Sequence, residues 1–169
     1  TIEPFVATAE RRFIVSAIGK DFFEFLCTTS DANYATIKSL AIKATAWYAY
    51  FLAQPHLRVV SGDLGVMMNQ PARTTMAPKW AHVDLVASTS ENADAALEDL
   101  LEELESISND NSFSDWKSSN GFKQNRALII RNATQLTEVL PAVQNRRRTF
   151  MALRFYLKKS EDTIATAVC

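Results

Sequence analysis

The residues with the clearest chemical potential in this chain are charged, and the two signs of charge are separated along it. The segment 91–105 contains no Lys or Arg and carries Glu91, Asp94, Glu98, Asp99, Glu102, Glu103 and Glu105. The segment 123–159 is basic, with Lys123, Arg126, Arg131, Arg146, Arg147, Arg148, Arg154, Lys158 and Lys159 against Glu138 alone. Because carboxylates and guanidinium groups pair strongly, the two poles can pair within one chain or between copies in a head-to-tail contact.

Each pole has a plain interpretation and a functional one. The acidic segment is either a solvated helix face or a docking strip, and a basic neighbour would offset the repulsion between its carboxylates at i and i+4. The basic segment is a solvated amphipathic helix, a surface for nucleic-acid phosphates, or a protein-docking surface. Docking is favoured because the complementary pole lies on the same chain. We therefore expect partner contacts at Arg146, Arg147, Arg148 and Arg154, with Glu98, Glu102 and Glu105 as the facing pole.

Residues that could support catalysis or hold a cofactor are sparse. His56 and His82 have no Cys, His or acidic residues at metal-ligand spacing. The segment Ser118-Ser119-Asn120-Gly121 lacks the Lys-Ser/Thr that completes a phosphate-binding loop. No nucleophile elbow or Cys-His signature is present. We expect no enzymatic activity, no cofactor and no metal.

The composition favours a single helical domain. At 169 residues the chain has the size of one domain. With 47% hydrophobic and 22% charged residues it is too apolar for disorder, and its 4 Gly and 5 Pro are too few for the turns of an all-β fold. No apolar run approaches the ~20 residues that a membrane span requires, so no membrane partner is expected.

These patterns predict a mainly α fold: a helical bundle with a long central helix, a small β-hairpin and a C-terminal helical segment. A helical body is expected at 1–108 with the hairpin at 57–68, then a loop at 109–121 and the C-terminal segment at 122–168, all within one domain, 1–169. A projecting loop at 69–77 carries Met76, a further candidate partner contact.

Within the body, Pro4 indicates the start of a first helix that ends at Gly19, and an aromatic turn follows at 21–26. A second helix is expected after a Ser30-Asp31 cap, with Trp47 in its broad apolar face and with Pro55 at its end. The long third helix begins at Pro78 and reaches about Ser108. In the C-terminal segment, helices are expected at 122–140, with a break near 132–134, and at 145–168.

Several landmarks together resemble a known family. They are Ile2-Glu3-Pro4-Phe5 with 9–14 and 18–20, the aromatic run 47–52, the hairpin 61–68 with Gly65-Val66, the acidic helix 95–104, Trp116, the segment 145–150, Leu153 and Glu161. In order and spacing they resemble the head-to-tail connector, or adaptor, ring proteins of tailed bacteriophages of Bacteroidetes, including crAss-like phages. Asn145 stands where that family has Ser, and either residue can cap a helix.

The resemblance covers nearly the whole chain and implies a structural virion protein in the neck region, assembled in the host cytoplasm. It implies a ring of identical subunits, twelve if it matches the portal, with DNA passing through the lumen. The implied partners are further copies of the chain, the portal protein, and the tail or further ring proteins. The alternative from the residues alone is a non-catalytic helical protein that binds nucleic-acid phosphates through its basic C-terminal third.

Overall fold

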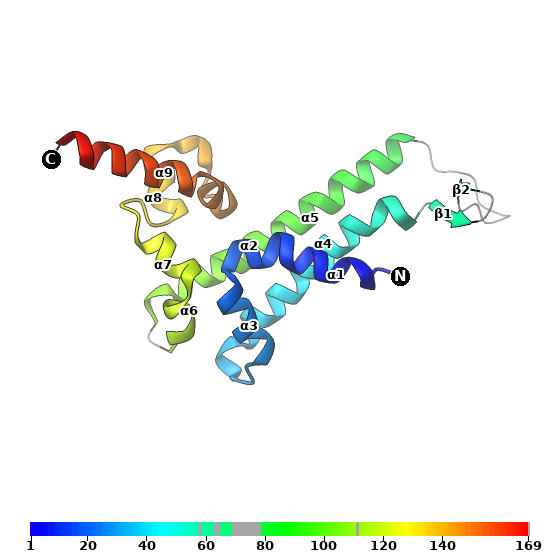
Figure 1. Cartoon of the computed structure of the whole chain (residues 1–169), viewed down its shortest axis with the longest axis horizontal. Coiled ribbons are helices and arrows are strands. Elements are labelled where there is room, and N and C mark those ends of the chain that lie inside the picture. The colour runs from blue at the N-terminus through cyan, green and yellow to red at the C-terminus, as the bar shows by residue number, and fades with distance from the viewer. Residues whose placement is uncertain (58, 63–64, 69–78, 111, 169) are drawn as a thin grey trace.

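A long antiparallel helix pair forms the centre of the molecule (Figure 1). The computed structural model describes residues 1–57, 59–62, 65–68, 79–110 and 112–168. The pair consists of α4 (Ala35–Leu57) and α5 (Lys79–Ser106). Side-chain bonds from Lys43 to Asp99 and from Gln54 to Thr89 fix its antiparallel register. The expected mainly helical fold is therefore confirmed.

The N-terminal helix runs from Glu3 to Ile18 and is interrupted by a π-helical segment. It comprises α1 (Glu3–Ala9), a π-helical segment (Glu10–Ile14) and α2 (Val15–Ile18). Its predicted end at Gly19 is confirmed, since Gly19 has φ +88, a value that suits glycine. The π-helical segment was not predicted. It contains Phe13, whose ring stacks on that of Tyr48 in α4 with 3.8 Å between centroids.

Two predictions about the next elements were wrong. The supposed aromatic turn at 21–26 is a helix, α3 (Lys20–Thr28), because Phe22 and Leu26 are spaced by one turn and both enter the core. Pro55 does not end α4 but lies in its last turn, two residues before the helix stops at Leu57. Asp31 caps a short 3-10 turn (Ala32–Tyr34) that leads into α4.

Between α4 and α5 the structure describes two short strands, β1 (Val59–Gly62) and β2 (Gly65–Met68). They pair antiparallel from Val59 opposite Met68 to Gly62 opposite Gly65. The two residues that join them, the loop at 69–77 with Met76, and Pro78 lie outside the described residues. The helix predicted to reach Ser108 ends at Ser106 and is followed by a 3-10 turn (Ile107–Asn109).

The C-terminal half contains more separate helices than the sequence predicted. The predicted loop at 109–121 contains α6 (Ser114–Ser118) and the start of α7 (Asn120–Arg126), because the side chain of Ser119 caps α7. The helix expected at 122–140 is interrupted at 127–132, and α8 (Ala133–Val139) starts afresh at an Asn132 cap. A 3-10 turn (Pro141–Val143) and α9 (Arg147–Val168) complete the chain.

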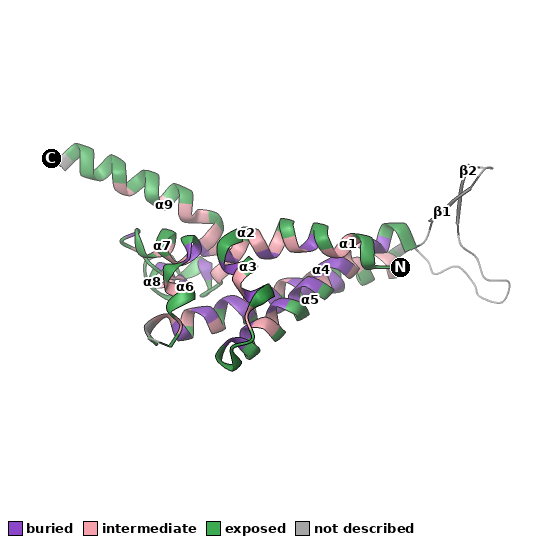
Figure 2. Cartoon of the chain, turned by 60° about the horizontal axis from the view of Figure 1, so that its bottom comes forward, coloured by how far each residue is buried: buried purple, intermediate pink, exposed green. Residues whose placement is uncertain are grey.

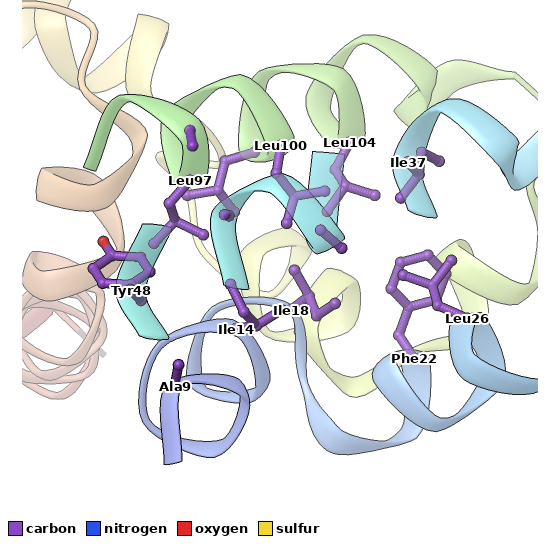
Figure 3. Packing of buried hydrophobic residues seen from close by; sticks show 14 of the residues in the cluster. Ala9, Ile14, Ile18, Phe22, Leu26, Ile37, Tyr48, Leu97, Leu100 and Leu104 are labelled. Carbon is purple, nitrogen blue, oxygen red and sulfur yellow. The ribbon is translucent and has the colours of Figure 1, made fainter. Parts of the chain in front are cut away.

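Buried residues form two clusters. The larger one joins α1–α3 to α4 and α5 (Figure 3). It also includes Trp116 of α6. The smaller one lies in the C-terminal half and consists of Leu128, Ala133, Leu136, Val143 and Phe150. Trp47 was expected in the core but is only half-buried. The inward face of α4 passes instead through Tyr48, which is 2% exposed.

Candidate interaction site

The charged residues singled out by the sequence meet where the start of α9 packs against α5. Four carboxylates, those of Asp94, Glu98, Glu102 and Glu105, are spaced by four, four and three residues and therefore line one side of α5. The first turn of α9 lies against this side and contacts each of them. This surface, with Arg147 and Arg148, is called the α5–α9 junction below.

Glu98 caps α9 from another helix. Its Oε1 accepts a hydrogen bond from the backbone N–H of Arg147, and its Oε2 accepts one from that of Arg148 at 3.3 Å. The first N–H groups of a helix have no partner within the helix, so an external acceptor is required. A carboxylate also suits the positive end of the helix dipole. Asn145, expected as the cap, instead has φ +55 and accepts a side-chain bond from Thr134.

The guanidinium group of Arg147 lies among three carboxylates. Its Nε donates to Glu105 Oε2 at 2.8 Å, while its Nη atoms lie 3.5 Å from Glu102 and 3.8 Å from Glu98. The Arg147 side chain is only 15% exposed, so solvent screens these pairs less than it would at an open surface. A hydrogen bond to a charged group, such as that from Arg147 Nε to Glu105, contributes roughly 1.5–3 kcal/mol to stability.

Arg148 completes the junction through a second acidic residue. Its Nη1 lies 2.6 Å from Asp94 Oδ2, and the other oxygen of Asp94 accepts a hydrogen bond from the hydroxyl of Tyr48 at 2.7 Å. Burial and this hydrogen bond raise the pKa of Tyr48 above its ordinary value. Tyr48 therefore stays protonated and ties α4 into the same network.

The junction also explains two locally unfavourable charge patterns. Cations at the start of a helix oppose its dipole, and carboxylates one turn apart repel each other. Arg147 and Arg148 have the first problem in α9, and the acidic side of α5 has the second. Each set of charges neutralises the other when the two helices pack together.

The structure thus shows Arg147, Arg148, Glu98, Glu102 and Glu105 paired within one chain. The sequence had left this possibility open but favoured contacts between copies. It identified both facing poles, but not Tyr48, which carries no charge, or Asp94 as a member of the set. The periodic spacing from Asp94 to Glu105 was the available signal for Asp94.

The remaining candidate residues lie elsewhere. Arg146 is exposed and has no ion pair among the residues that the structure describes. Arg154 donates from Nη1 to Asn125 Oδ1 of α7 at 3.0 Å, and burial lowers the pKa of its guanidinium. Met76 lies outside the described residues.

Below the junction, α5, α7, α8 and α9 enclose a pocket of about 520 Å³. Its lining is partly apolar and includes the charged residues Glu102, Glu105, Arg126, Arg131 and Arg147. Within the described part of the chain, no group of three or more His, Cys, Asp or Glu is arranged to hold a metal ion. None of the described helices is long and apolar enough to span a membrane.

Residues 16–126 match the model of a family of unknown function, DUF6712. The chain belongs to this family. The match extends from α2 to α7 and so contains the acidic side of the junction, whereas Arg147 and Arg148 lie beyond it. No curated protein and no solved structure matches the chain.

Proposed function

We propose that this chain is a structural virion protein, a head-to-tail connector subunit that forms a ring beneath the portal and joins it to the tail. The observation that carries the proposal is the construction of α9. Its base is fixed to α5 by the α5–α9 junction, and its far end projects from the body (Figure 2). Large apolar side chains along it are exposed: Phe155, Tyr156 and Ile164. A helix held in one direction with uncovered apolar side chains is suited to contact another protein.

Further support comes from the distribution of apolar surface. Large exposed hydrophobic residues occur near the start of α5, where Trp80 is 68% exposed, and again in α8 and α9, where Val139 and Phe155 are each 72% exposed. These positions lie towards opposite ends of an elongated molecule (Figure 1). A ring subunit between a portal and a tail needs contact surfaces on more than one side.

The proposal includes a ring of twelve copies, matching the portal, with DNA passing through the lumen without sequence-specific contact. The α5–α9 junction changes the role of the arginines in this proposal. Arg147 and Arg148 set the direction of α9, and partner contact is made by the helix they hold. Arg146, being exposed, remains available to a partner or to DNA.

The alternative, a nucleic-acid-binding protein, has weaker support. Two arginines of the basic cluster are neutralised by carboxylates of the same chain, which reduces the positive surface offered to phosphates. If the alternative were correct, the monomer would bind duplex DNA with an affinity that falls steeply as salt is raised. The connector proposal predicts only weak binding by the monomer.

The decisive experiment combines the purified chain with the portal protein of the same virus and images the product by negative-stain electron microscopy. Rings attached to the portal are expected. Arg147→Glu together with Arg148→Glu should abolish attachment because the base of α9 loses its carboxylate partners. Lys123→Glu, which reverses an exposed cation of α7, is the matched control and should leave attachment intact. Absence of rings from the unaltered chain, with and without portal, would overturn the proposal.

A further inference from the structure

The middle of α9 carries two aromatic side chains that the described residues leave mostly uncovered. Phe155 is 72% exposed and Tyr156 64% exposed, and their ring centroids lie 5.7 Å apart. The C-terminal end of α9 extends away from the body, and most residues after Leu157 are exposed (Figure 2). Because each aromatic side chain has a large apolar surface, this pair favours a site that removes it from water.

A matching apolar pocket occurs on the other side of the molecule. It measures about 300 Å³ and lies between α1, the π-helical segment, α3 and α4. Its floor and walls are apolar and include Val6, Phe23, Leu26, Ala41 and Ile42. Ile42 is 63% exposed, although it borders a well-packed core.

The charges around the two surfaces are complementary. Glu10 and Lys38 line the pocket beside its apolar residues. On α9, Lys159 follows Phe155 by one turn and therefore lies on the same side of the helix, and it has no ion pair among the described residues. Asp162, two turns after Phe155, is already paired with Lys158 at 2.8 Å. A helix placed with Phe155 in the pocket can therefore bring Lys159 to Glu10 on the rim.

One chain cannot bring these surfaces together in this structure. The free end of α9 points away from α1, α3 and α4 in both views (Figures 1 and 2). We propose that the Phe155–Tyr156 side of α9 packs into the pocket between α1, α3 and α4 of a second copy of this chain. The two surfaces differ, so the contact is heterologous and repeats from copy to copy until a ring closes. This inference rests on the proposed connector function and names the contact between its subunits.

The test uses two full-length variants, each with one altered surface. Phe155→Glu together with Tyr156→Glu alters the helix, and Ile42→Glu alters the pocket; all three positions are exposed, so both variants should fold. Each variant alone should remain monomeric in light scattering after size-exclusion chromatography. Their mixture should give a one-to-one dimer and nothing larger, because it retains one intact helix and one intact pocket. Asn92→Glu, at an exposed position of α5 outside both surfaces, is the control and should assemble like the unaltered chain.

A crosslink provides an independent measurement for a chain that assembles weakly. Cys27 is exposed at the edge of the pocket, so Tyr156→Cys should form an interchain disulfide with it under mild oxidation, in a Cys169→Ser background. Peptide mass spectrometry would detect the bond between positions 27 and 156, and Val139→Cys should give none. A mixture that stays monomeric together with no 27–156 crosslink overturns the inference.

The outcomes separate this contact from the connector function. Portal-attached rings that persist in both glutamate variants would disprove the contact and leave the connector function standing. A one-to-one dimer from the mixture, with self-assembly of the unaltered chain but no attachment to the portal, would support the contact and disprove the connector function.

Discussion

The cap that Glu98 places on α9 allows a quantitative prediction. Glu98→Ala removes the acceptor of two backbone N–H groups and the 3.8 Å contact with Arg147. Loss of an N-cap costs about 0.5–2 kcal/mol, and the long contact adds at most about 1 kcal/mol because Glu105 still binds Arg147. We expect the free energy of unfolding to fall by about 2 kcal/mol, which corresponds to a loss of roughly 4–8 °C in Tm.

The measurement is urea unfolding of Glu98→Ala, with amide hydrogen exchange followed at the start of α9. Faster exchange is expected there, since the N–H groups of Arg147 and Arg148 lose their acceptor. Glu98→Gln keeps one uncharged acceptor and should show an intermediate loss. Glu91→Ala is the control, because Glu91 is exposed on the same helix and has no ion pair in the described part of the chain; its effect should stay within about 0.5 kcal/mol. Equal effects of Glu98→Ala and Glu91→Ala would refute the capping argument.

Three further predictions concern the body. Gly121→Ala should destabilise the fold by roughly 1–3 kcal/mol in urea unfolding, because a Cβ there would lie 2.6 Å from the carbonyl oxygen of Ile18; an unchanged midpoint would contradict this close packing. Trp116→Ala should cost about 3–5 kcal/mol and Trp47→Ala clearly less, since Trp116 is 5% exposed and Trp47 is half-buried; the reverse order would show that the core is misassigned. Finally, the folded state keeps Tyr48 protonated at pH values where the unfolded chain ionises it, so stability should fall as pH rises above about 10. Tyr48→Phe should reduce that fall, and an unchanged pH profile would exclude this cause.

The sequence predicted a helix boundary correctly where a single residue at that position determines it. Gly19 ends the first helix because its φ of +88 suits glycine, and the break before α8 lies at the Asn132 cap. The predictions failed where packing overrode local preference. The segment 21–26, predicted as a turn, is helical because Phe22 and Leu26 both pack into the core. Likewise, α4 continues past Pro55. The inward face of α4 was also ambiguous, because apolar residues occupy more than one side of it.

The sequence identified most of the charged residues of the candidate site but not the contacts between them. Spacing placed Glu98, Glu102 and Glu105 on one side of a helix, and the run from Arg146 to Arg148 identified a basic pole. Spacing cannot say that the backbone N–H groups of α9 reach Glu98, since that contact joins residues 49 positions apart. It also cannot distinguish Arg146, which stays exposed, from Arg147 beside it.

The sequence by itself determined that this chain is mainly helical and that its charges form two opposed poles, because helix propensity and charge are properties of residues and their near neighbours. Only the tertiary structure decided that the poles meet within one chain. Ion pairing depends on distance and burial, and both are set by how α9 packs against α5. The same packing leaves Phe155 and Tyr156 exposed in the middle of α9.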